Sequence, residues 1–115
     1  MKGRRVMLEI AVDKVGEVII LARELHDPFG RGETELVSFI EGLNDDEKVN
    51  LVALMWVGRG TFGPDDWDEA INTARTEAST PTADYLMGSP HLADHLENGL
   101  DALGISALEA EDDAY

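Results

Sequence analysis

The sequence predicts an all-α fold, a compact irregular bundle of about five to six helices with a buried central helix at residues 45–57. Apolar residues recur at three- and four-residue spacings along most of the chain, as they do on the buried face of a helix. Helix start and stop signals separate these segments by short connections. No stretch has the alternating pattern of a half-buried strand, so no sheet is expected.

The length and composition fit one globular domain. The chain has 115 residues, 43% of them apolar and 29% charged, which favours a folded domain over disorder. We expect a single helical domain over residues 1–115, with a loose basic leader at 1–7 and an acidic tail at 105–115. The absence of cysteine excludes disulfides, thiol catalysis and cysteine metal sites, and it is typical of a reducing cytosol.

Two helices are predicted before the central one. Apolar residues at helical spacing indicate the first over residues 12–26. Residues 27–32 include one proline and two glycines, so an exposed loop is expected there. A shorter helix follows over residues 33–41, and Gly42 suits its end.

The central helix has the clearest boundaries. Asn44, followed three residues later by Glu47, is a capping-box pattern, so the helix is expected to begin directly after Asn44. Residues 51–57 are apolar throughout, which indicates burial on most sides. Gly58 and Gly60 then suit a left-handed cap at the end of the helix.

Proline and serine mark the starts of the remaining helices. Pro64 suits the first turn of a fourth helix, and the acids after it stabilise the positive end of the helix dipole. A short fifth helix is expected over residues 81–87. Ser89 as the cap and Pro90 at the first helical position predict the last helix.

Parts of the sequence resemble a small bacterial family of domains of unknown function. The residues that carry the resemblance are 51–60, Asp66-Trp67, Ala83-Asp84-Tyr85-Leu86, Pro90 and Gly99-Leu100, and the most specific part is Trp56-Val57-Gly58-Arg59-Gly60. The resemblance covers about residues 8–104. It implies a helical, cytoplasmic protein without an assigned activity, and it implies no catalytic residue.

The net charge of −15 restricts the partners of this protein. Such an acidic surface repels phosphates, so neither direct nucleic-acid binding nor binding to anionic membranes is expected. The charge maintains solubility, attracts a basic protein partner, or mimics nucleic acid toward a basic protein.

No targeting or membrane segment is evident. Glu9 and Asp13 interrupt the apolar residues after the basic start, so no signal-peptide core forms. The longest apolar run, residues 51–57, is much shorter than the roughly 20 residues that span a bilayer. A cytoplasmic location is therefore expected.

The last predicted helix carries an apolar seam of four leucines, Leu92, Leu96, Leu100 and Leu103. This seam either packs within the chain or joins two copies in a homodimer, and the sequence leaves both open.

Two histidines on the last helix are candidate metal ligands. His91 and His95 are four residues apart, so they share a helix face, with Asp94 beside them. This order resembles the inverted zinc-protease motif, but no third ligand is marked. The alternative is a pair of surface histidines near a helix start. No metal and no cofactor are predicted.

Arg59, at the exit of the central helix, is the first candidate for ligand binding. Gly58 and Gly60 would let a backbone approach closely, and the guanidinium would hold an anion. In the alternative, Arg59 locks the turn to the next helix through an ion pair with one of three acids: Asp65, Asp66 or Asp68.

The other ligand-binding candidates are Trp56, Trp67, Asp84 and Tyr85. The three aromatic residues could line a pocket, or they could belong to the core with one polar atom bonded near its rim.

No complete catalytic constellation is present, and no catalytic residue is predicted. The leading hypothesis is a non-enzymatic, cytoplasmic protein-interaction or regulatory module. One alternative is a small-ligand-binding protein or enzyme that uses Arg59 with His91, His95 or Asp84. Another is an acidic mimic of nucleic acid that inhibits a basic protein.

Overall fold

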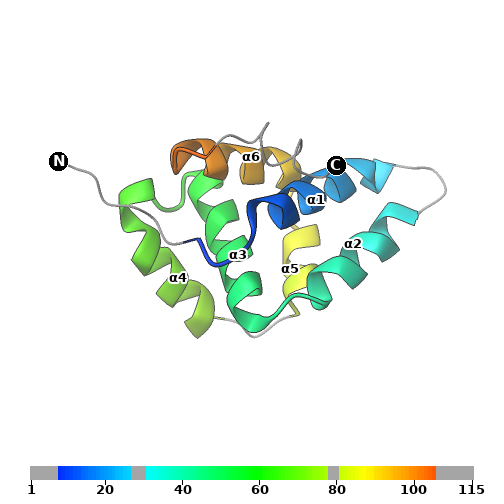
Figure 1. Cartoon of the computed structure of the whole chain (residues 1–115), viewed down its shortest axis with the longest axis horizontal. Coiled ribbons are helices and arrows are strands. Elements are labelled where there is room, and N and C mark those ends of the chain that lie inside the picture. The colour runs from blue at the N-terminus through cyan, green and yellow to red at the C-terminus, as the bar shows by residue number, and fades with distance from the viewer. Residues whose placement is uncertain (1–7, 27–30, 78–80, 106–115) are drawn as a thin grey trace.

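The computed structural model describes residues 8–26, 31–77 and 81–105 of the chain, and within them it is all-α, as predicted (Figure 1). The elements are α1 (Val12–Arg23), the 3-10 turn η1 (Glu24–His26), α2 (Arg31–Glu41), α3 (Asp45–Arg59), the 3-10 turn η2 (Pro64–Asp66), α4 (Trp67–Thr76), α5 (Thr82–Met87) and α6 (Leu92–Ala102). The basic leader at 1–7, part of the expected loop at 27–30, and the acidic tail beyond Ile105 lie outside the described residues.

α3 is the central helix, which confirms the prediction from its apolar run. Figure 1 shows α4 on one side of α3, α2 and α5 on the other, and α6 across one end. α3 makes its most extensive contacts with α6 and then with α4. Leu51, Leu54 and Met55 are completely buried, since neighbouring helices cover several sides of α3.

Both ends of α3 have the caps that the sequence predicts. The Asn44 side chain accepts a bond from the Glu47 amide, and the Glu47 side chain accepts one from the Asn44 amide, which completes a capping box. Gly60 has a φ of +91° in the left-handed region. The amides of Gly60 and Thr61 donate to the carbonyls of Val57 and Trp56, so the end of α3 is a Schellman motif.

Two glycines allow α3 and α6 to approach closely. A Cβ on Gly58 would collide with the carbonyl oxygen of His95, and a Cβ on Gly99 would collide with the carbonyl oxygen of Leu54. Backbone packs directly on backbone at these two points, so the largest helix contact of the fold depends on residues without side chains.

The structure corrects three predicted boundaries. α2 begins at Arg31, so Arg31 and Gly32 belong to a helix rather than to an exposed loop. Pro64 opens the separate turn η2, and α4 begins only at Trp67. α6 begins at Leu92, after His91 adopts a left-handed conformation with a φ of +60°.

The leucine seam of α6 faces the inside of the molecule. Leu92, Leu96 and Leu100 are buried, and Leu103 is partly buried against the core. α6 packs on α3 and α1, so the contacts of the chain itself satisfy this seam. The homodimer therefore remains a prediction, and this seam no longer supports it.

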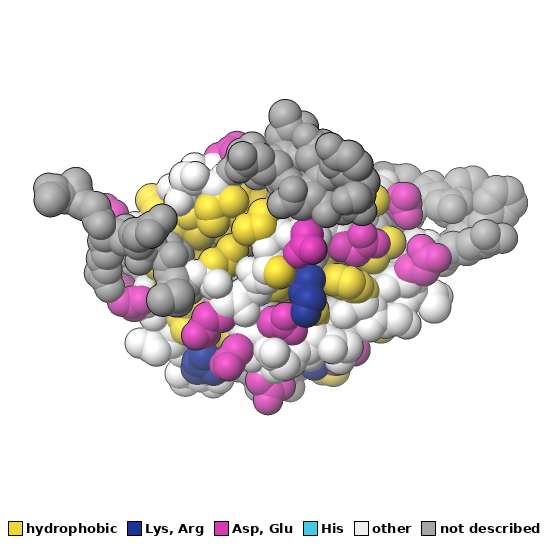
Figure 2. Space-filling view, in the orientation of Figure 1, with side chains coloured by type: hydrophobic (Ala, Val, Ile, Leu, Met, Phe, Trp, Pro, Cys, Tyr) yellow, Lys and Arg dark blue, Asp and Glu magenta, His cyan; other side chains and the backbone are white. Residues whose placement is uncertain are grey.

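The surface carries acids interspersed with the few basic residues. Figure 2 shows carboxylates spread over one face of the molecule with lysine and arginine side chains between them. In residues 8–26, 31–77 and 81–105, no helix has the length and apolar character that crossing a bilayer requires.

Candidate functional site

Arg59 is held at the exit of α3 by the turn that ends the helix. The Schellman motif places Thr61 beside it, and the Arg59 Nε donates a 3.0 Å hydrogen bond to the Thr61 Oγ1. Arg59 is exposed, so its remaining N–H groups face solvent or the neighbouring surface.

The expected ion pair between Arg59 and the acids after Pro64 is not formed. Within the part of the chain that the structure describes, Arg59 has no carboxylate within ion-pair distance. The reason is local: the αL turn at Gly60 brings Thr61, and not an acid, to the Nε edge of the guanidinium.

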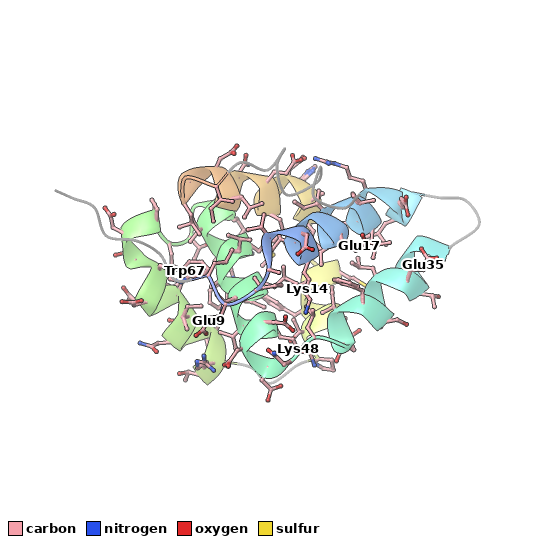
Figure 3. All side chains as sticks on the ribbon, in the orientation of Figure 1. Glu9, Lys14, Glu17, Glu35, Lys48 and Trp67 are labelled. Carbon is pink, nitrogen blue, oxygen red and sulfur yellow. The ribbon has the colours of Figure 1, made fainter. Side chains whose placement is uncertain are left out.

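The other basic side chains that the structure describes all have a carboxylate partner. The pairs are Lys14–Glu47 at 2.7 Å, Arg23–Glu97 at 2.6 Å, Lys48–Glu41 at 3.3 Å and Arg75–Asp46 at 2.9 Å. Figure 3 shows Lys14 and Lys48 over the region where α1 and α2 meet the start of α3. Arg59 is thus the exception among the described basic side chains of a very acidic protein.

Arg59 lines an open hollow between the end of α3 and the segment that joins α5 to α6. This hollow has a volume of about 360 Å³, and we call it the Arg59 hollow. Its lining residues are Arg59, Asp84, Tyr85, Gly88, Ser89 and Pro90. Three of the five predicted ligand-binding residues, Arg59, Asp84 and Tyr85, therefore come together from two different helices.

A fourth candidate, Trp56, supports the hollow from the core side. Its Nε1 donates a 2.9 Å hydrogen bond to the Tyr85 hydroxyl oxygen, and the two rings meet edge to face at 6.5 Å. Trp56 is 6% exposed, whereas Tyr85 is 39% exposed. Because the Tyr85 oxygen accepts this bond, its own proton is left to donate elsewhere.

Trp67, the fifth candidate, does not belong to the Arg59 hollow. It is 5% exposed at the start of α4, and Figure 3 shows it on the α4 side of the molecule. It packs in the core, which is the alternative that the sequence left open.

Ser89 does not cap the last helix as predicted, because α6 begins three residues later, at Leu92. Its Oγ is buried and has no hydrogen-bond partner within the described residues. Ser89 lines both the Arg59 hollow and a second hollow of about 350 Å³, which lies between the end of α1 and the start of α6.

The two histidines do not join Arg59. His91 lines the second hollow, and the backbone carbonyl of His95 packs against Gly58 in the contact between α3 and α6. Their rings lie edge to face at 6.5 Å, and the His95 Nδ1 is buried with no partner among the described residues. The described residues include no group of three histidine, aspartate or glutamate side chains that could hold a metal ion.

Two important polar residues were missed by the sequence reasoning. Asn50 is completely buried; its Oδ1 accepts from the Glu9 amide at 2.8 Å, and its Nδ2 donates to the Asp46 carbonyl at 2.9 Å. Glu41 accepts a 2.9 Å bond from the Ala83 amide. The only sequence signal for Asn50 was a polar residue directly before an apolar run, and Glu41 gave no signal.

Two carboxylates are held in their charged form by these contacts. The Ala83 amide, followed by Lys48, lowers the pKa of Glu41. The hydrogen bond from Lys14, followed by the Asn44 amide, lowers the pKa of Glu47. Glu41 thereby ties the end of α2 to the start of α5, the helix that carries Asp84 and Tyr85.

The fold and the hollow together define a small all-α domain in which Arg59 faces solvent beside a depression and has no carboxylate partner among the described residues. The chain belongs to the family described as protein of unknown function (DUF3775), whose model matches residues 33–105. The match includes residues 56–60 and every residue that lines the Arg59 hollow, whereas α1 lies before it. Neither a curated protein nor a solved structure shows significant similarity to the chain.

Proposed function

We propose that this protein is a non-enzymatic binding module, and that it holds a carboxylate group of its ligand at Arg59. The observation that carries the proposal is that Arg59 has no carboxylate partner among the described residues, while Lys14, Arg23, Lys48 and Arg75 each have one. The chain has 24 acidic and 9 basic residues, so an arginine is expected to find a carboxylate partner within the protein.

The local geometry suits Arg59 to this task. The bond from its Nε to Thr61 uses one of the five N–H donors of the guanidinium and restricts its rotation. Four donors remain on the two terminal nitrogens, and they can bind both oxygens of a carboxylate. A side chain that is already held in place loses less conformational entropy on binding.

The rest of the hollow provides the mixture of polar and apolar groups that ligand sites use. The exposed Tyr85 hydroxyl has a proton that the described residues leave unused, whereas the Ser89 Oγ, also unpaired among them, is buried. The rings of Tyr85 and Pro90 supply apolar surface beside them.

The test follows the indole N–H signals of the two tryptophans by NMR during titration with sodium acetate and N-acetylglycine. Trp56 is bonded to a residue of the hollow, whereas Trp67 lies elsewhere in the core and serves as the internal control. We expect a saturable shift of the Trp56 signal in the wild type at low salt, because salt screens exposed charges.

The matched variants are Arg59→Gln and Arg75→Gln, which remove one exposed positive charge each. The shift should be lost in Arg59→Gln and kept in Arg75→Gln. An equal, saturable shift in both variants, or no saturable shift in the wild type with any carboxylate or amino acid, would overturn the proposal.

A further inference from the structure

Asp84 lines the same hollow as Arg59, and its carboxylate also has no partner among the described residues. It lies in the first turn of α5 and is exposed. Within the described residues its carboxylate forms no ion pair and accepts no hydrogen bond from a side chain. Where other opposite charges of this protein come near each other, they make direct pairs, as Lys14 and Glu47 do at 2.7 Å. Arg59 and Asp84 both line the hollow, but no ion pair joins them.

The charge of the protein limits which carboxylates can use Arg59. The chain has a net charge of −15, and Asp84 adds a negative charge within the hollow itself. A simple carboxylate therefore gains the attraction of Arg59 but meets repulsion from Asp84 and from the wider surface. If the ligand also carries an ammonium group, Asp84 attracts that group, and the site then makes two favourable charged contacts instead of one.

The size of the hollow limits the ligand as well. Ligand sites in proteins have volumes of roughly 300–1,000 Å³. The Arg59 hollow, at about 360 Å³, lies at the small end of this range, which suits a single small molecule. Tyr85 and Pro90 can contact an apolar group of that molecule.

From these observations we infer that the ligand of the Arg59 hollow is a free amino acid, with its carboxylate on Arg59 and its ammonium group on Asp84. The inference rests on the proposed function, since it names the class of ligand that the same site would bind. The Tyr85 hydroxyl would donate a further hydrogen bond to the carboxylate, and the amino-acid side chain would lie over the exposed ring of Tyr85.

The experiment screens the twenty free amino acids singly against the full chain, with the Trp56 indole N–H as the readout. The tightest binder is then compared with its N-acetyl derivative, which keeps only the carboxylate, and with its amide, which keeps only the ammonium group. We expect both derivatives to bind about tenfold more weakly than the amino acid, because each loses one charged contact.

Asp84→Asn separates this inference from the proposed function. The variant should weaken binding of the amino acid about fivefold and strengthen binding of the N-acetyl derivative, because it removes an attraction for one and a repulsion for the other. Asp94→Asn is the matched control, since Asp94 is also an exposed acid in the first turn of a helix but lines the second hollow.

The outcomes are distinct. If the N-acetyl derivative binds as tightly as the amino acid, and Asp84→Asn changes neither, the amino-acid inference is wrong while a carboxylate site at Arg59 stands. If Arg59→Gln leaves all binding unchanged, both proposals fail. If none of the twenty amino acids shifts the Trp56 signal, the amino-acid inference fails, and the acetate titration decides the proposed function separately.

Discussion

The indole Nε1 of Trp56 donates a 2.9 Å hydrogen bond to the hydroxyl oxygen of Tyr85, and this bond joins the buried central helix α3 to the short helix α5. Phe62 also packs against Trp56, and the centroids of the two rings are 5.6 Å apart. The partly exposed Tyr85, which lines the Arg59 hollow, is therefore positioned by a buried residue of the core.

Tyr85→Phe should destabilise the protein by about 1–2 kcal/mol, because the largely buried indole N–H of Trp56 loses its acceptor. Urea denaturation gives the free energy of unfolding, and the Trp56 indole resonance reports the lost bond directly. Tyr115→Phe is the control, because it makes the same chemical change at the only other tyrosine of the chain. Equal stability of the two variants would contradict the structural role of this bond.

Gly58→Ala should destabilise the protein by at least about 2 kcal/mol, because the new methyl group would collide with the backbone carbonyl of His95. The clash is between the new Cβ and a backbone carbonyl, so a side-chain rotation cannot relieve it. Thermal unfolding followed by circular dichroism is the measurement. At Gly63, a Cβ would meet nothing closer than an Asp66 side-chain oxygen at 3.5 Å, so Gly63→Ala should change the melting temperature little. Similar losses in both variants would disprove the close contact between α3 and α6.

Asn50→Ala should cost about 2–3 kcal/mol, because the Glu9 amide and the Asp46 carbonyl both lose a partner and the side chain leaves a gap in the core. Asn72→Ala is the comparison, since Asn72 is exposed on α4. Hydrogen exchange provides the decisive measurement: the Glu9 amide should lose its protection in Asn50→Ala. Unchanged protection would show that Asn50 does not hold this segment.

Glu41 should make the stability of the protein depend on pH. The pKa of Glu41 is lowered in the folded state, first by the Ala83 amide and then by Lys48. The charged carboxylate therefore interacts with these two groups more favourably than the protonated one does. The contribution is complete above the ordinary pKa of about 4.5 and is lost as pH falls through the lowered folded pKa. Glu41→Gln should therefore reduce stability at pH 7, and its difference from the wild type should vanish in acid.

The measurement for Glu41 is urea denaturation of the wild type and Glu41→Gln between pH 7 and pH 3. Glu35→Gln is the matched control, because Glu35 is exposed on the same helix, α2 (Figure 3). If the difference in the free energy of unfolding between the wild type and Glu41→Gln stays constant over this pH range, the charge on Glu41 is not the cause of the pH dependence.

The sequence alone predicted the helices whose signals are local. The capping box of Asn44 and Glu47 and the left-handed Gly60 are interactions between residues within a few positions of one another, so the bounds of α3 followed closely from them. The predicted start of the last helix failed because Ser89 and Pro90 form a turn before it, and His91 takes a left-handed conformation. A cap pattern shows where a helix can begin, and packing against α1 and α3 selects where it does begin.

At the candidate site, too, the sequence predicted some features and the tertiary structure decided the others. The sequence singled out Arg59, Trp56, Asp84 and Tyr85 by residue type, because arginine and aromatic side chains near glycines are typical of binding sites. Which of them meet was decided by the crossing of α3 and α5, and so was the placement of Trp67 in the core. The acids that follow Arg59 in the sequence were the expected ion-pair partners, and the turn at Gly60 instead brings Thr61 to the guanidinium.

The amino-acid sequence by itself determined the helical class, the central place of α3 and the caps at its ends, since hydrophobic periodicity and capping act over a few residues of one segment. The tertiary structure alone decided that Arg59 lacks a carboxylate among the described residues, that Glu41 anchors α5, and that Asn50 is buried. These properties depend on contacts between residues about 40 positions apart or on the course of a turn, and residue spacing along a single chain does not encode such distances.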